Sequence, residues 1–342
     1  MGEVAAPAAQ LGARGAGGEE LEAGNRSQRL AARRIAVTGG GGFIGAHLLL
    51  HLVAEGAEVD VLGPTPLKRR TLRSLIERQK VRFRPFALDA ERAGLAETLD
   101  GCDALVHLRY RPPPTEGFWP QLLDGVNNNL LETIRLLDAA AAAGVRQVCL
   151  ASSVSVYTPP ALGIDEDGPV GGPVTPYAIV KLQQEDCVRQ WTRQTGRPAA
   201  ILRLATVYGP GEKVGRAIPN FIRAVLSGGQ PVVAGRGSAH FDPIYVTDVV
   251  EAFLCALEKR AEGTFNIATG KAWPTRHIAR LVLRLCGADG DVALNHAEPD
   301  RDRPVCNVAR AQSVLGFKAK TSLESGLQAE IDWLRRLEVK PA

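Results

Sequence analysis

Short apolar runs alternate along residues 34–204 with longer stretches in which apolar positions recur every three or four residues. The runs predict strands near residues 34–38, 58–62, 81–86, 104–108, 146–151 and 199–204. The stretches between them predict helices near residues 43–55, 67–79, 92–99, 119–143 and 177–195. Strands that alternate with helices in this way indicate an α/β fold with a doubly wound parallel sheet.

The two ends of the chain depart from this pattern. Residues 1–32 are rich in Ala, Gly, Glu and Arg and have no sustained apolar period, which predicts a disordered extension. After Gly209-Pro210-Gly211 the elements become shorter, so residues 211–340 are expected to form mainly a smaller lobe. We expect this lobe at the C-terminal ends of the strands, where open sheets bind ligands, beside a main domain over residues 33–210 with returning segments.

Composition narrows the class of protein. The 41 basic and 37 acidic residues leave a net charge of +4 that is spread along the chain, which indicates neither a nucleic-acid partner nor a membrane surface. No apolar window is long enough to span a bilayer, and the start of the chain lacks a signal peptide's apolar core. We therefore expect a cytoplasmic protein whose partner is a small molecule.

The cysteines also indicate a cytoplasmic protein. None forms a CxxC pair, which argues against a metal site or a disulfide framework and predicts buried thiols in a reducing compartment. They are Cys102, Cys149, Cys187, Cys255, Cys286 and Cys306.

A glycine-rich turn joins the first predicted strand to the first predicted helix. Glycines at Gly39, Gly42 and Gly45 let the backbone turn tightly and approach a pyrophosphate, whose charge then lies at the positive end of the helix. Such a run alone also occurs in ordinary strand–helix turns, but a strand precedes this one and an amphipathic helix follows it. The turn therefore predicts a dinucleotide site.

A second motif predicts proton transfer. Tyr177 and Lys181 are four residues apart and share one helical face, so the ammonium can favour the phenolate of a tyrosine whose ordinary pKa of about 10 is too high for a base. Ser153, just past the fifth strand, can orient the same substrate oxygen. Each feature alone also fits a solvated helix or a turn; their order along the chain favours a catalytic set.

With these motifs the chain resembles the extended short-chain dehydrogenases/reductases, the NAD(P)-dependent nucleotide-sugar epimerase/dehydratase family, over about residues 34–335. The resemblance extends through Arg203-Leu204-Ala205-Thr206-Val207-Tyr208-Gly209-Pro210, Tyr245-Val246-Thr247-Asp248 and Leu315-Gly316-Phe317. It implies a Rossmann-type doubly wound sheet with a smaller C-terminal substrate lobe. It also implies catalytic roles for Ser153, Tyr177 as the acid/base, and Lys181, which lowers the tyrosine pKa and holds the nicotinamide ribose.

The resemblance also implies binding residues. The cofactor would contact the glycine turn with Phe43 and Ile44, and then Arg69, Arg70, Asp89, Leu108, Arg109, Asn129, Tyr177 and Lys181. The substrate would contact Ser153, Thr206, Asn220, Arg236 and Arg301. No metal is implied.

Departures from the family pattern bear on the cofactor. Gly63 stands where the family has an acidic residue for the adenosine ribose, and the basic residues Lys68 to Arg70 follow. An absent carboxylate with nearby cations accommodates a 2′-phosphate, so NAD or NADP is expected, with NADP favoured. The alternative is that the basic cluster is only a solvated helix start. Asp89 is the candidate carboxylate for the adenine amino group, although an ungapped comparison with the family places Leu88 at that position. The family's His-Leu-Ala-Ala is here His107-Leu108-Arg109-Tyr110. His107 is interpreted as a packed core residue.

Departures also bear on the substrate. Phe241 replaces the family's arginine for a nucleotide diphosphate, so Arg236, Arg301 or Arg303 would have to serve instead. Val154-Ser155 replaces the Asp-Glu pair of the sugar 4,6-dehydratases, which disfavours dehydration.

Three functions remain open from the sequence. The leading hypothesis is a nucleotide-sugar epimerase that moves a hydride between a nicotinamide and a secondary alcohol. The second is an NADPH-dependent ketoreductase of a keto-sugar or another biosynthetic ketone, and the third is a non-catalytic dinucleotide-sensing protein. The helices near residues 119–143 and 177–195 resemble the pair through which the family dimerises, so a homodimer is expected unless their outer faces are merely solvated.

Overall fold

A parallel sheet forms the centre of the computed structural model, which describes residues 30–64, 76, 81–86, 92–114, 116–158, 162–171, 175–212, 215–300 and 302–338. Within these residues the sheet has seven strands, and every neighbouring pair is parallel. In spatial order they are β12 (Gly263–Ile267), β7 (Ala199–Leu204), β5 (Gln147–Ser153), β4 (Ala104–His107), β1 (Arg34–Thr38), β2 (Glu58–Gly63) and β3 (Val81–Pro85).

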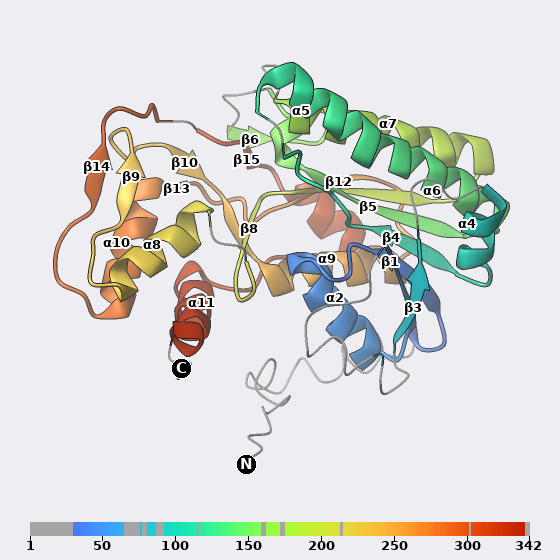
Figure 1. Ribbon diagram of the computed structural model, residues 1–342, viewed down its shortest axis with the longest axis horizontal. Helices are drawn as coiled ribbons and strands as arrows, with labels where there is room; N and C mark the ends of the chain where they lie inside the picture. The colour runs from blue at the N-terminus through green and yellow to red at the C-terminus, as the bar shows by residue number, and fades with distance from the viewer. Residues whose placement is uncertain are drawn as a thin grey trace, which may run out of the picture.

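Helices cover both faces of this sheet (Figure 1). One face carries α2 (Phe43–Ala54) and α9 (Val246–Glu258). The other carries α4 (Arg92–Leu99), α5 (Phe118–Gly125), the π-helical turn η1 (Val126–Leu130), α6 (Leu131–Ala142) and α7 (Pro176–Thr195). The strand order reverses between β1 and β4, which is the switch point where open α/β sheets bind ligands.

The predicted doubly wound sheet is confirmed, with one strand more than the sequence pattern indicated. All six predicted strands are present, whereas β12 joins the sheet from within the segment assigned mainly to the lobe. The predicted helix over 119–143 is α5, η1 and α6 in direct succession. The helix predicted over 67–79 lies outside the described residues except for Ile76, and the division of the chain near residue 210 stays a prediction.

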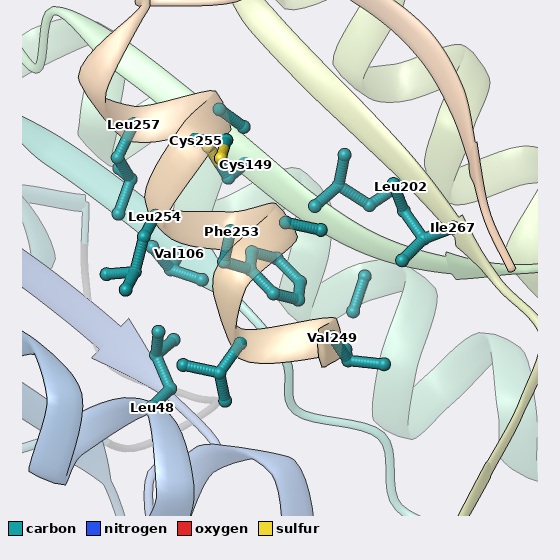
Figure 2. Packing of buried hydrophobic residues seen from close by; sticks show 14 of the residues in the cluster. Leu48, Val106, Cys149, Leu202, Val249, Phe253, Leu254, Cys255, Leu257 and Ile267 are labelled. Atoms are coloured by element: carbon teal, nitrogen blue, oxygen red, sulfur yellow. The ribbon is translucent and has the colours of Figure 1, made fainter. Parts of the chain in front are cut away.

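The core beneath α9 shows why this part of the chain returns to the sheet. Val249, Phe253, Leu254 and Leu257 of α9 are almost wholly buried, and Figure 2 shows them packed with residues of the strands and α2. A helix that is apolar on nearly all sides is stable only when it is covered on nearly all sides. The segment after residue 245 therefore completes the main domain.

The lobe has its own apolar core and connects to the main domain by short strand pairs. Its core is formed by α8 (Ala217–Leu226), α10 (Thr275–Cys286) and α11 (Leu323–Glu338). Around these helices lie β9 (Val232–Ala234) with β14 (Ala293–Asn295), and β10 (His240–Phe241) with β13 (Trp273–Pro274). The remaining elements are β8 (Thr206–Tyr208) paired with β11 (Pro243–Tyr245), β6 (Leu162–Ile164) paired with β15 (Val305–Cys306), η2 (Val154–Val156) and η3 (Ala311–Leu315).

Three expectations from composition concern the N-terminal extension, membrane-spanning helices and the cysteines. Residues 1–29 of the predicted extension lie outside the described residues, and Leu30 is wholly buried in the main core. No helix in the described part of the chain is both long and apolar enough to cross a membrane. All six cysteines are described and none is disulfide-bonded; Cys187 and Cys286 are partly exposed and the other four are buried.

Candidate functional site

The turn between β1 and α2 depends on its glycines. Gly39 has a φ of +73°, and a Cβ there would lie 2.8 Å from the backbone nitrogen of Arg109. A Cβ on Gly45 would overlap the carbonyl oxygen of Gly39, so α2 approaches the turn this closely only because no side chain intervenes. Gly42 precedes the first turn of α2, which has no side-chain cap and no acidic residue. The residues present therefore fit a dinucleotide, with the diphosphate at the helix N-terminus.

The first turn of α2 contains Phe43 and Ile44, two of the residues expected at the cofactor. Both are partly buried against the main core, and the Phe43 ring makes an edge contact with His47. The imidazole Nε2 of His47 lies 2.8 Å from the carbonyl oxygen of Pro210. This contact joins α2 to the segment that leads into the lobe.

The segment after β4 lies directly against the glycine turn. The backbone of Leu108 and Arg109 faces Gly39, while the Arg109 guanidinium forms an ion pair with the buried Glu132 of α6. Burial raises the pKa of Glu132 to about 7, and Arg109 opposes this shift. The Arg109 charge is therefore directed to a carboxylate, and its backbone is what borders the dinucleotide turn.

Asn129 fixes the same segment from the other side. Its Oδ1 accepts the backbone N–H of Arg111 at 2.6 Å, and its Nδ2 donates to the Arg111 carbonyl oxygen at 3.0 Å. His107 is a packed core residue, as interpreted from the sequence, with ring nitrogens 2.6 Å from Thr38 and 2.9 Å from Thr133. Burial lowers the pKa of His107 to about 3, so the ring is neutral.

Ser153, Tyr177 and Lys181 come together at the C-terminal end of β5. Ser153 is the last residue of that strand, and its hydroxyl donates to Ser155 Oγ at 3.1 Å and lies near enough to the Tyr177 phenol to lower the pKa of that group. α7 begins after Thr175, whose side chain accepts the Ala178 N–H at 3.2 Å. This cap places Tyr177 in the first turn of α7 and Lys181 one turn later, beneath the end of β5.

The charges around Tyr177 differ from the expected arrangement. Burial raises the pKa of the Tyr177 phenol, while the nearby Ser153 hydroxyl and the positive charge of Arg216 lower it. Lys181 instead donates to the carbonyl oxygen of Ala151 at 2.8 Å, and its Nζ lies 5.2 Å from the centroid of the Tyr110 ring. The groups that favour the phenolate here are thus Ser153 and Arg216.

Lys181 itself is almost completely buried. Burial lowers its pKa to about 8, and the nearby carboxylate of Glu185 partly opposes the shift. The side chain is consequently charged at neutral pH, but it holds its proton less tightly than an exposed lysine does.

Glu185, one turn after Lys181, is the centre of a buried ionic network that the sequence analysis missed. Its Oε1 accepts the Ser152 hydroxyl at 2.5 Å and the Arg203 Nε at 2.9 Å, and its Oε2 accepts the Arg203 Nη2 at 2.7 Å. The spacing of four residues from Lys181 was the available signal, because it places Glu185 on the same face of α7. This network joins α7 to β5 and β7 behind the catalytic candidates.

Of the residues expected at the substrate, Thr206 has an arginine beside it. Its hydroxyl accepts a bond from Arg303 Nη1 at 3.2 Å. The Arg303 side chain is exposed, but surrounding atoms remove part of its hydration, and this effect and then the charge of Arg216 lower the pKa of its guanidinium. Arg216 therefore lies within electrostatic reach of both Arg303 and Tyr177.

Asn220 and Arg236 have local roles in the lobe. The Asn220 Oδ1 accepts the Gly215 N–H at 3.1 Å, and the backbone of Arg236 donates to Asp300 at 3.1 Å. In the described part of the chain, no hydrogen bond or ion pair links either residue to the catalytic candidates. Phe241, in the position of the family's diphosphate arginine, is buried in the lobe core.

Four predicted site residues cannot be placed. Arg69, Arg70, Asp89 and Arg301 lie outside the described residues, so their expected roles stay predictions. Gly63 is the last residue of β2 and offers no carboxylate for a ribose hydroxyl.

The family model described as "NAD dependent epimerase/dehydratase family" matches residues 35–268. The UDP-glucose 4-epimerase of Mycolicibacterium smegmatis is 31% identical over 311 residues, which cover 88% of this chain and 98% of that protein.

Two solved structures are similar along nearly their whole length. MoeE5 in complex with UDP-glucuronic acid and NAD is 31% identical, with a TM-score of 0.78, 89% of this chain covered and 99% of that one. The UDP-glucuronic acid 4-epimerase from Bacillus cereus in complex with UDP-glucuronic acid and NAD is 26% identical, with the same TM-score and the same coverage of both chains. The likeness therefore includes the lobe as well as the sheet.

Proposed function

The chain belongs to the NAD-dependent epimerase/dehydratase family, and from that premise we propose that it is an NAD-dependent nucleotide-sugar epimerase acting at C4 of a UDP-linked hexose. The observation that carries the proposal is the juxtaposition of Ser153, the last residue of β5, with Tyr177 in the first turn of α7, which brings a hydroxyl and an ionisable phenol to the C-terminal edge of the sheet. The 4-epimerase relatives support the choice of reaction. Their UDP-sugar ligands support the substrate class.

The proposed mechanism assigns the proton to Tyr177. NAD, when bound, accepts a hydride from the sugar carbon and later returns it. As the hydride leaves, Tyr177 takes the proton of the sugar hydroxyl and leaves a ketone; Ser153 holds the oxygen of that ketone. The ketone then turns over, and Tyr177 gives the proton back as the hydride returns to the opposite face. Because the hydride and the proton both return, the cycle needs no external oxidant.

NAD is the cofactor of the family to which the chain belongs, and it is one of the two dinucleotides that the sequence allowed. The glycine turn, the backbone of Leu108 and Arg109, and Lys181 are the groups we assign to it. The preference for NADP rested on Gly63, which ends β2 and offers no carboxylate, and on Lys68 to Arg70, which lie outside the described residues; it stays a prediction. We further place the protein in the cytoplasm, in keeping with its free thiols.

The deciding experiment follows the purified protein with UDP-glucose, UDP-glucuronic acid or UDP-N-acetylglucosamine by NMR, with no cofactor added. Interconversion of one of these sugars with its C4 epimer, without net consumption of cofactor, is the expected result. Failure with all three, combined with oxidation of added NADPH by a keto-sugar, would replace the epimerase with the ketoreductase alternative. Failure of both reactions while NAD still binds would support the non-catalytic sensor.

We propose Arg303 as an anchor for the diphosphate of the substrate. It is exposed, it lies beside Thr206 and near Arg216, and no carboxylate in the described part of the chain forms an ion pair with it. A charge-assisted hydrogen bond to phosphate contributes about 1.5–3 kcal/mol. Arg303→Ala should therefore raise KM for the UDP-sugar about 10- to 100-fold while kcat changes little.

Steady-state kinetics measure this effect, and Arg276→Ala is the control because Arg276 pairs with Asp291 on the lobe surface. An unchanged KM in Arg303→Ala would remove the residue from the substrate site. Arg303→Lys should lie between the two, since an ammonium keeps the charge but lacks the planar fork of the guanidinium.

A homodimer is the second part of the proposal. Large apolar side chains are exposed along α5 and α6, the helices that continue one another beside α7. Trp119 is 75% exposed and Leu123 is 62% exposed, which is unusual for such residues in neighbouring turns of one helix. We propose that a second copy covers this face through a two-fold interface.

Sedimentation of the wild type and of the double variant Trp119→Glu/Leu123→Glu tests the interface. The wild type should sediment as a dimer and the double variant as a monomer. In a two-fold dimer the two introduced carboxylates of each copy would be buried close to those of the other copy, without a counter-charge. Leu162→Glu is the matched control, since Leu162 is 79% exposed but belongs to β6. A monomeric wild type, or a double variant that stays dimeric, would reject this face as the interface.

A further inference from the structure

One aromatic side chain contacts two of the three catalytic candidates. The Tyr110 ring makes an edge contact with the Tyr177 ring, with centroids 4.8 Å apart and planes at 84°. The Lys181 ammonium lies over the Tyr110 ring, 5.2 Å from its centroid. Tyr110 follows β4, so it reaches Tyr177 and Lys181 at the C-terminal edge of the sheet, where the preceding residue, Arg109, borders the glycine turn. The family pattern has alanine at this position, and alanine cannot make either contact.

The backbone on both sides of Tyr110 is anchored. Arg109, the residue before it, forms the buried ion pair with Glu132. Arg111, the residue after it, exchanges two backbone hydrogen bonds with the Asn129 side chain. Both anchors belong to the same helical stretch, η1 and α6. The ring is thus held at the catalytic pair by a fixed backbone, unlike an exposed side chain in a loose loop.

The ammonium of Lys181 has little room for another partner while the ring is in place. Only 3% of Lys181 is exposed, and its Nζ donates to the Ala151 carbonyl oxygen. A cation over the face of an aromatic ring is attracted by the ring, and more strongly where water is excluded. Burial raises the pKa of the Tyr110 phenol to about 12, and Tyr177 adds to this shift, so Tyr110 stays protonated and does not compete as a base.

We propose that Tyr110 is a positioning residue that covers the Lys181 ammonium and must move off it before the ammonium can hold the nicotinamide ribose. The inference rests on the proposed function, because the ribose-holding role of Lys181 comes from the family resemblance. Displacing the ring from the ammonium costs free energy, which reduces the net binding free energy of the dinucleotide. The chain consequently holds its cofactor less tightly than the same chain would with the family's alanine at position 110.

Dinucleotide titrations of four proteins test the proposal. NAD and NADH are titrated at pH 7, by calorimetry and by NADH fluorescence, into dinucleotide-free wild type, Tyr110→Ala, Tyr110→Phe and Tyr110→Leu. Tyr110→Ala should bind about 3- to 30-fold more tightly than the wild type, which is the affinity equivalent of the attraction between a ring and a desolvated ammonium. Tyr110→Phe keeps the ring and should stay within about twofold of the wild type.

Tyr110→Leu keeps the proposal falsifiable if the alanine variant does not fold. It retains apolar bulk without a ring face, so it should also bind more tightly than the wild type, though less so than Tyr110→Ala. Equal or weaker binding by the folded Ala and Leu variants would overturn the proposal. So would a loss of turnover in Tyr110→Ala at unchanged NAD affinity, because the ring would then only support the packing of Tyr177.

The two proposals fail in different ways. Binding of NAD and NADH is measured without any sugar, so a protein that epimerises none of the sugars still reports on Tyr110. Conversely, equal cofactor affinity in all four proteins would reject the role of Tyr110 and leave the epimerase assignment standing.

Discussion

Tyr177→Phe should lower turnover by about two to four powers of ten, the usual contribution of a positioned acid/base, while NAD binding persists. The substitution keeps the ring that packs against Tyr110 and removes only the phenol oxygen, whose pKa Ser153 lowers. Without this oxygen, no group in the assigned mechanism accepts the sugar hydroxyl proton. Single-turnover kinetics with the UDP-sugar measure the loss, and a calorimetric NAD titration measures the retained binding.

The matched control is Tyr245→Phe, which removes a phenol oxygen from the end of β11. Tyr245 packs edge-on against Tyr208 and has no place in the mechanism. It should keep turnover within a few-fold of the wild type. Turnover of Tyr177→Phe close to that of Tyr245→Phe would exclude Tyr177 as the acid/base.

Glu185→Gln should reduce the free energy of unfolding by about 3–5 kcal/mol, because it leaves a buried guanidinium without its counter-charge. Glu185 is wholly buried and Arg203 is nearly so. Each carboxylate oxygen of Glu185 accepts two hydrogen bonds: Oε1 from Ser152 and Arg203, and Oε2 from Arg189 and Arg203. Glutamine replaces one of these oxygens by an N–H₂ group, which is a donor and would face two other donors. Urea denaturation followed by circular dichroism gives the change.

The neighbouring residue provides the control for charge alone. Asp186→Asn removes an exposed carboxylate that also bonds Arg189, and exposed pairs contribute about 0–1 kcal/mol. A stability loss in Glu185→Gln no larger than in Asp186→Asn would mean that the buried network does not stabilise the fold. Such a result would also mean that Glu185 does not fix α7 against β5.

That the three catalytic candidates would lie together was predictable, because local sequence determines the position of each. Gly39 has a positive φ, Ser153 ends a strand that is buried throughout, and Tyr177 is in the first turn of a helix whose cap and first proline are adjacent in the chain. A parallel sheet then brings the strand ends and helix starts to one edge. No long-range information was required to place these residues together.

The side-chain partners were not predictable in the same way. Arg109 was expected at the cofactor, but its guanidinium pairs with Glu132, which lies on a helix 23 residues later. Tyr110 was identified only as a departure from the family's alanine, whereas its ring contacts Tyr177 and Lys181. Such contacts depend on rotamers and on distant backbone, and neither periodicity nor motif spacing encodes them.

The late entry of β12 into the sheet also affects how the protein is made. β7 lies between β5 and β12, so its outer edge has no partner on a growing chain until Gly263–Ile267 has left the ribosome. Ile267 is added about 60 residues after Leu204, which at about 5–20 residues per second leaves about 3–12 s. During that interval the nascent chain presents an open, apolar strand edge, the kind of surface that pairs with other chains. A message truncated before codon 263 would make this exposure permanent.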